Sequence, residues 1–196
     1  MCQQLAGPPF TTTLGVIKET SVQALVKLVS LLPEAQRFKV LFRMGILRVP
    51  MMGYVRARLV ELSPVSAVVR INLSRRTKNA YNSLFIGAFS VGADCVAGLF
   101  PMKFMFETGH QTIPIMKSAT AEYYKRVNTY AHFTCMQGVE LYALCNEVVA
   151  TGERLEASIV INVTAPEEFG DEPVARITQV ISLKNLGSSQ KRSLQS

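Results

Sequence analysis

The sequence predicts an α+β protein: an antiparallel sheet wrapped around one long central helix, with an N-terminal helical arm. Two observations favour this class. Residues 84–100 (LFIGAFSVGADCVAGLF) are apolar on nearly every side, so a helix there needs cover all round. The segments 64–74 and 154–164 alternate apolar and polar residues, as strands with one buried face do. A sheet that wraps around the helix satisfies both patterns.

The first fifty residues are expected to form the helical arm. Residues 20–33 place apolar side chains at helical spacing and end at Pro33, and residues 34–47 form a second helical stretch before Pro50. Its basic residues fit a solvated helix face, and membrane or calmodulin binding is the alternative. We therefore expect an N-terminal segment and arm at 1–50, a main domain at 51–186 and a flexible tail at 187–196.

The main domain is expected to begin with a hairpin, in which residues 54–61 pair with 64–74 around Ser63-Pro64. The apolar helix follows and is expected to close at Pro101. Beyond it the pattern predicts, in order, strands at 117–127 and 130–136 around an Asn128-Thr129 turn, a helix at 138–150, and strands at 154–164 and 173–184.

Composition and charge narrow the class of partner. Hydrophobic residues make up 48% of the chain and charged residues 18%, which excludes intrinsic disorder and predicts an oligomer interface or an apolar ligand site. The net charge of +7 lies in the first half, because residues 1–80 hold 12 basic and 3 acidic residues. Such an excess suits a nucleic acid, an anionic membrane or a phosphorylated ligand.

Cysteine usage and targeting signals indicate an intracellular protein. The four cysteines are widely spaced, without a CxxC pair or a short His/Cys cluster, so we expect neither a metal site nor a disulfide framework. The N-terminus lacks the pattern of a secretory signal. We expect a reducing compartment, either cytoplasmic or mitochondrial. The 84–100 run is at the lower length limit for a membrane span and carries Asp94 near its centre, so we expect a helix buried in protein, with no transmembrane span.

One local motif carries a family resemblance. Arg75-Arg76-Thr77-Lys78-Asn79 leads to Phe85-Ile86-Gly87, and Asp94 follows seven residues after Gly87. This pattern resembles the hotdog-fold thioesterase superfamily, in particular the phenylacetate-pathway type of acyl-CoA thioesterase and an uncharacterised hotdog group with an N-terminal helical arm. In that family an Asn is followed six residues later by a His-Gly-Gly that opens the central helix, and then by an acid. Phe85 and Ile86 depart from the motif.

The resemblance implies a set of site residues. The catalytic candidates are Asp94, Asn79 and Gly87. The resemblance also implies a dimer, in which the oxyanion donors of one chain lie near the acid of the other. Asn79 would orient the water or bond the carbonyl, with a plain turn residue as the alternative. The alternative for Asp94 is a buried carboxylate satisfied by backbone or by a partner such as Lys117. Phe85 and Ile86 would line the substrate entrance.

The residues support the same chemistry by themselves. Backbone N–H groups at a helix N-terminus can bind an oxyanion without a side chain, and a glycine there leaves room for the substrate. Asp94 lies two turns from Gly87, on about the same side of the helix. If its apolar neighbours desolvate Asp94, its pKa should rise toward that of a general base. The run Arg75, Arg76 and Lys78 could meet the phosphates of coenzyme A, or be a solvated charge run.

The function expected from the sequence is hydrolysis of a medium- or long-chain acyl-CoA to free acid and coenzyme A, as part of lipid metabolism. No cofactor is expected, because coenzyme A belongs to the substrate, and the partner is a second copy of the chain in a homodimer or dimer of dimers. The alternative is a non-catalytic hotdog module that binds acyl-CoA or acyl chains. A nucleic-acid partner is not expected, since interleaved aromatic residues and Gly-rich RNA motifs are missing.

Overall fold

The computed structural model describes residues 33, 36–40, 42–43 and 49–185. The chain divides into two compact units, residues 1–37 and 38–196. The helix expected at 20–33 lies outside the described residues except for Pro33. Of the helix expected at 34–47, residues 36–40 and 42–43 are described and are helical. The arm boundary at residue 50 and the tail at 187–196 stay predictions.

The second unit is built on a six-stranded antiparallel sheet with the order β1-β2-β4-β5-β6-β3. The predicted α+β class is confirmed. Along each central strand, buried apolar residues alternate with half-exposed residues that are mostly polar, which gives the sheet one apolar face. The strands are β1 (Arg58–Leu62), β2 (Ala67–Asn72), β3 (Thr112–Tyr123), β4 (Tyr130–Cys135), β5 (Leu155–Thr164) and β6 (Pro173–Asn185).

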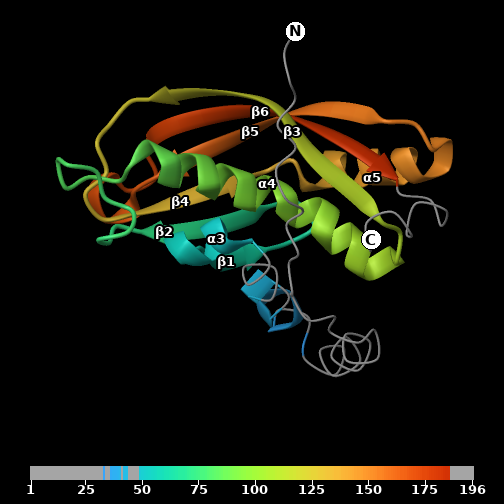
Figure 1. Cartoon of the computed structure of the whole chain (residues 1–196), viewed down its shortest axis with the longest axis horizontal. Helices are drawn as coiled ribbons and strands as arrows, with labels where there is room; N and C mark the ends of the chain where they lie inside the picture. Colours follow the sequence, from blue (N-terminus) through green and yellow to red (C-terminus); the bar gives the residue numbers. More distant parts are fainter. Residues whose placement is uncertain (1–32, 34–35, 41, 44–48, 186–196) are drawn as a thin grey trace, which may run out of the picture. The chain divides into compact units, whose positions relative to one another are not determined.

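A 23-residue helix, α4 (Ile86–Thr108), lies across the apolar face of this sheet (Figure 1). Phe100 and Phe104 of α4 and Phe133 of β4 are among the largest side chains that are almost completely buried. The core therefore sits between the helix and the sheet, as the apolar run predicts. The smaller helices of the unit are α3 (Pro50–Val55), α5 (Gly138–Thr151) and α6 (Pro166–Phe169).

The expected end of the central helix at Pro101 is wrong. The helix continues through Pro101 to Thr108 and ends at Gly109, whose φ of 75° gives the left-handed cap that glycine favours. A proline inside a helix removes one backbone hydrogen bond, to the carbonyl four residues before it. Here Phe100 and Phe104 are buried on either side of Pro101, and this burial holds the helix together beyond it.

The expected strand at 54–61 is wrong at its N-terminal end. Residues 50–55 form α3, and β1 begins only at Arg58. Pro50 stands in the first turn of α3, where its missing N–H costs nothing. The predicted pairing itself is confirmed, because β1 and β2 form an antiparallel pair in which Leu62 is opposite Ala67.

The expected hairpin around Asn128-Thr129 is wrong as well. The strands on either side, β3 and β4, are not neighbours: β3 pairs with β6, while β4 pairs with β2 and β5. The alternation that identifies a strand does not identify its partner. The helix expected at 138–150 and the strands expected at 154–164 and 173–184 are confirmed within one residue at each end.

Candidate functional site

The N-terminus of α4 is held by the loop that precedes it. Phe85 donates its backbone N–H to the carbonyl of Thr77 at 2.8 Å, and Leu84 donates to the carbonyl of Val127 at 2.8 Å. Thr77 is almost fully buried, and its hydroxyl donates to the carbonyl of Asn72 at 2.7 Å. These bonds connect the end of β2 to the start of α4, so the first turn of the helix has a fixed position.

This first turn presents backbone donors to its surroundings. Phe85 is the N-cap residue and makes no side-chain cap, so the N–H groups of Ile86 and Gly87 have no acceptor within the helix. The helix dipole adds partial positive charge at the same place. A β-carbon on Gly87 would lie 2.8 Å from the Phe85 ring, so the ring packs directly against this glycine. Phe85 and Ile86 are both about half exposed.

A hollow of about 240 Å³ opens beside these donors, and we call it the first hollow. It joins predicted site residues from two segments, because Arg76 of the loop lines it together with Phe85 and Gly87 of the helix. The Arg76 guanidinium lies 5.5 Å from the centre of the Tyr54 ring of α3. The structure therefore brings three of the eight predicted site residues around one small, mostly apolar hollow.

Asp94 lies further along α4 and does not line the first hollow. It is partly buried, and this burial raises the pKa of its carboxyl group above the usual aspartate value. Within the described part of the chain the carboxylate makes no hydrogen bond or ion pair. Lys117, one partner considered from the sequence, pairs instead with Glu156 at 2.8 Å. Next to it, burial and the Asp94 charge raise the pKa of Cys95 to about 12, so that thiol stays protonated.

The remaining predicted residues lie on the loop before α4. The Asn79 side-chain oxygen accepts from the backbone N–H groups of Tyr81 at 2.8 Å and Ser83 at 3.1 Å. These are the bonds of a turn residue, and the catalytic role of Asn79 stays a prediction. Lys78 donates to the Asn82 side chain at 2.8 Å. Arg75 is exposed, so the two cations lie at the surface next to Arg76.

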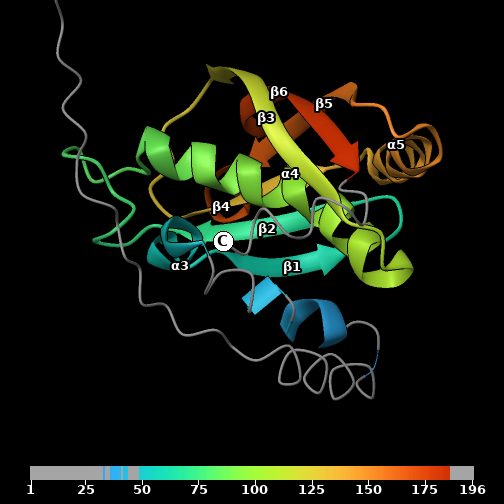
Figure 2. The same ribbon diagram turned by 45° about the vertical axis from the view of Figure 1, so that its right-hand side comes forward.

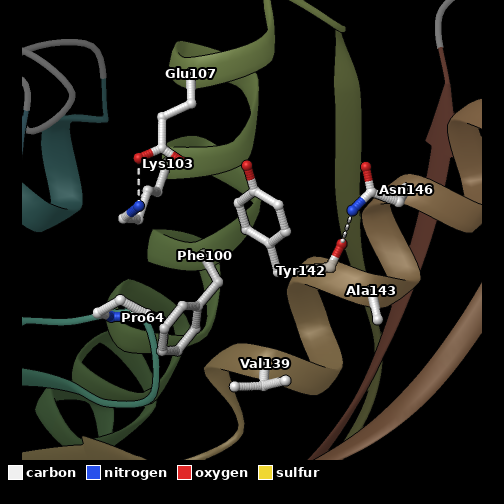
Figure 3. Close-up of a pocket in the computed structure, with 8 residues that line it drawn as sticks. All are labelled: Pro64, Phe100, Lys103, Glu107, Val139, Tyr142, Ala143 and Asn146. Atoms are coloured by element: carbon white, nitrogen blue, oxygen red, sulfur yellow. Dashed lines mark hydrogen bonds and ion pairs between the residues drawn. The ribbon is translucent and has the colours of Figure 1, made fainter.

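A larger cavity of about 450 Å³ lies elsewhere, between the C-terminal half of α4 and α5 (Figure 3). Lys103 is buried there and forms an ion pair with Glu107, and its ammonium lies 5.3 Å from the Phe38 ring centre. Tyr142 stands beside this pair, and burial, reinforced by the Glu107 charge, raises the pKa of its hydroxyl. The two charges neutralise each other, and none of the eight predicted site residues lines this cavity, so it lies outside the candidate site.

Sequence reasoning missed the contribution of α3 to the site. Tyr54 and Met51 line the first hollow, whereas the sequence pattern predicts a strand at Tyr54 and indicates no role for Met51. Pro50 was the available signal, because proline is favoured at the first position of a helix. The buried Lys103–Glu107 pair has helical i, i+4 spacing, but nothing in the sequence marks it as buried.

The fold is the hotdog fold, as the sequence motif implied. A protein of unknown function from Pseudomonas aeruginosa, described as a probable thioesterase, matches with a TM-score of 0.62 at 18% identity, covering 79% of this chain and 97% of that one. A protein of unknown function from Chlorobaculum tepidum matches with a TM-score of 0.67 at 10% identity, covering 78% and 97%. A thioesterase from Haemophilus influenzae matches with a TM-score of 0.51 at 11% identity, covering 69% and 83%.

The family is defined by sequence as well as by fold. Residues 37–182 match the model of a family described as Domain of unknown function (DUF4442). The match covers most of the chain, and the chain belongs to this family. No curated protein matches it.

Two further observations concern membranes and metals. Among the described helices, α4 is the one whose length and hydropathy would suit a membrane span, and 56% of that apolar window is buried inside the protein, as expected of a core helix. The described residues contain no group of three or more His, Cys, Asp or Glu side chains that could hold a metal ion.

Proposed function

We propose that the protein is a thioesterase that hydrolyses medium- or long-chain acyl-CoA to free acid and coenzyme A. The observation that carries this proposal is the presence of two chemical features on α4. Unpartnered N–H groups stand at its start, and a partly buried carboxylate with a raised pKa, Asp94, lies two turns further on. Thioester hydrolysis needs an oxyanion site and a group that accepts a proton from water, and these features supply one of each.

In the proposed reaction, the thioester carbonyl oxygen binds the N–H groups of Ile86 and Gly87. The Asp94 carboxylate accepts a proton from a water molecule as the water oxygen attacks the carbonyl carbon. The oxyanion that forms is stabilised by the same N–H groups and by the helix dipole. The carbon–sulfur bond then breaks, and the coenzyme A thiolate leaves with the proton that Asp94 took from the water. The Asp94 carboxylate is thereby regenerated, and the acid is released.

The distance along the helix favours a site shared between two chains. Gly87 and Asp94 are separated by seven residues, which is about 10 Å of helix rise. A carboxylate that far from the oxyanion donors of its own chain is poorly placed to activate a water at the same carbonyl. We therefore propose a homodimer in which Gly87 of one protomer faces Asp94 of its partner, as the resemblance implies.

The edge strand β3 is the proposed dimer contact. It is the longer of the two edge strands of the sheet, with 12 residues against 5 in β1, and residues 117–123 are exposed along its whole second half. An unpaired strand edge is a template for pairing with another chain. The other edge strand, β1, offers fewer residues for such pairing and carries the charged residues Arg58 and Glu61.

The basic residues near the first hollow fit the coenzyme A part of the substrate. Arg76 lines the hollow, and Arg75 and Lys78 are exposed on the same loop. Their positive charge would bind the phosphates outside the hollow while the thioester reaches the α4 N-terminus. The reaction as proposed uses no cofactor. The three buried free cysteines, Cys95, Cys135 and Cys145, support the proposal of a reducing compartment, cytoplasmic or mitochondrial.

The test is a hydrolysis assay over a panel of acyl-CoAs, with coenzyme A release as the readout. We expect wild-type turnover and a loss of about 100-fold or more in Asp94→Ala, since positioned acid–base groups contribute this much. Asp171→Ala removes an exposed aspartate of the loop before β6 and is the matched control, which should keep wild-type activity. Equal activity of Asp94→Ala and wild type would refute the proposed mechanism.

A second candidate function is acyl-CoA binding without hydrolysis. Phe85 favours it, because it occupies the place of the motif His and its ring packs over Gly87, next to the proposed oxyanion donors. Calorimetry separates the two functions. Saturable binding of acyl-CoA, together with no turnover of any member of the panel, would select the binding module over the enzyme.

A further inference from the structure

A second hollow lies further along the same side of α4, and no lining residue belongs to both hollows. It measures about 150 Å³ and is lined mainly by Phe42, Met52, Cys95, Gly98 and Met102. Residues of both α3 and α4 line each hollow. Helix α3 supplies Met51 and Tyr54 to the first hollow and Met52 to the second. Figure 2 shows α3 and α4 in a view that separates α3 from β1.

The helix residues that line the two hollows fall on one face. Gly87, Val91, Cys95, Gly98 and Met102 follow each other at intervals of three or four residues, which is the spacing of one side of a helix. From Gly87 to Met102 this face rises by about 22 Å. The two hollows therefore lie in line beside α3 and α4, and we call this pair of hollows the α3–α4 trough.

The trough is polar at one end only. Among the described residues that line the two hollows, Arg76 is the only charged one, and it stands at the end where the α4 amides lie. The far end is closed by apolar side chains such as Phe42 and Met102. Methionine side chains occur along its length, and their flexible thioethers adapt to an apolar ligand. This shape and polarity fit a linear amphiphile with an anionic head near Arg76.

We propose that the α3–α4 trough holds the acyl chain of the substrate and that Gly98 sets the chain length it accepts. This inference rests on the proposed thioesterase function and adds the substrate class, a straight acyl chain that runs from Gly87 toward Met102. A β-carbon added at Gly98 would meet no atom within 4 Å, so the backbone tolerates a side chain there. Because Gly98 lines the second hollow, that side chain would occupy the space of the distal methylenes.

The experiment compares Gly98→Leu with wild type on straight-chain acyl-CoAs from short to long. We expect kcat/KM for the longest accepted chains to fall by about tenfold or more, because each excluded methylene costs about that much, while short chains are unaffected. Ala143→Leu is the matched control, since it adds a side chain of the same size beside the larger cavity at α5. Its chain-length profile should equal that of wild type.

Each outcome decides the proposal. The assignment of the trough would be overturned by an unchanged chain-length profile in Gly98→Leu, or by an equal loss of activity at all chain lengths in a folded Gly98→Leu. A shift of the profile in Ala143→Leu alone would overturn it too. None of these outcomes contradicts the thioesterase function. Preference of the wild type for a compact aromatic acyl group over every straight chain would also overturn it. Thermal unfolding and sedimentation of Gly98→Leu show whether it folds and assembles as wild type does. If it does not, Gly98→Ala replaces it, with a smaller shift in the chain-length profile expected.

Failure of the proposed function has a different signature. If the wild type hydrolyses no acyl-CoA, the trough is tested by calorimetric titration with straight-chain acyl-CoAs. Weaker binding of long chains to Gly98→Leu, with short chains unchanged, would then support the trough without the reaction. Equal binding of long chains by both proteins would overturn it.

Discussion

Asp94 is the residue among the described Asp and Glu side chains whose carboxyl pKa is clearly shifted. Burial raises the pKa of its carboxyl group, and the described residues provide it with neither an ion pair nor a hydrogen bond. A charge desolvated in this way weakens the fold unless another group compensates it. The sequence pointed to Asp94 for that reason, since it is the one charge in an apolar run of seventeen residues.

Asp94→Asn is expected to stabilise the protein in a pH-dependent way. The folded-state pKa is raised, so below the ordinary aspartate pKa of about 3.9 the carboxyl group is protonated in both states and carries no penalty. As the pH rises through the interval between that value and the raised pKa, the folded state must bear a desolvated charge and loses stability. Urea unfolding across this interval should show the advantage of Asp94→Asn growing with pH. An advantage that shrinks with pH would contradict the burial account.

Two glycines of α4 are predicted to respond oppositely to alanine. A β-carbon at Gly92 would lie 2.5 Å from the Phe133 ring, whereas one at Gly98 would meet nothing within 4 Å. Gly92→Ala should therefore lower the free energy of unfolding by about 1–3 kcal/mol through overpacking. Gly98→Ala should raise it by about 0.5–1 kcal/mol, because alanine loses less conformational entropy in a helix. Chemical denaturation of both variants measures the difference, and equal effects would refute it.

At the scale of elements, the loop before α4 decides where the proposed oxyanion donors stand. Its anchor is Thr77, whose hydroxyl also accepts the Ser74 backbone N–H at 2.8 Å. Thr77→Val keeps the shape but leaves the Ser74 N–H and the Asn72 carbonyl without this partner. We expect a loss of about 1–3 kcal/mol in stability and a fall in kcat. Thr151→Val removes an exposed hydroxyl at the end of α5 and is the control. Thr77→Val with wild-type stability and kcat would show that the loop is held by other contacts.

The elements that the sequence predicts well are those with a single strong pattern. Apolar and polar residues alternate over 154–164, the segment 173–184 is rich in Val and Ile, and both strands form as expected. Pro101 misled the prediction because its local cost is outweighed by the burial of Phe100 and Phe104, which depends on the sheet. The short helix α3 has too few residues to show a helical period. The contribution of α3 to the lining of the trough could therefore not be predicted from the sequence.

At the scale of the molecule, the sequence predicted the architecture but not which strands pair with each other. A sheet around one apolar helix follows from composition and period alone, whereas the pairing of β3 with β6 depends on where the long connections run. The two hollows of the candidate site differ in the same respect. Gly87, Phe85 and Arg76, which are close in sequence, line one hollow, while the second hollow is lined in part by Met52 of α3.

The proposed shared site makes a prediction about mixed dimers. Asp94→Ala removes the acid, and Gly87→Val blocks the approach to the oxyanion donors, so each homodimer should be inactive. In a heterodimer of the two variants, one site combines the intact Gly87 of one protomer with the intact Asp94 of its partner. Mixing the two variants should therefore restore activity, measured as coenzyme A release. If both groups act within one chain, the mixture stays inactive.

The central claim is that the Asp94 carboxylate activates water against a thioester held at the N-terminus of α4. Its most direct test is the release of coenzyme A from a long-chain acyl-CoA by wild type and by Asp94→Asn, with substrate binding measured in parallel. The account predicts turnover by the wild type and a loss of about 100-fold or more in Asp94→Asn at unchanged affinity. Equal turnover by the two proteins, or binding without turnover in the wild type, would contradict it.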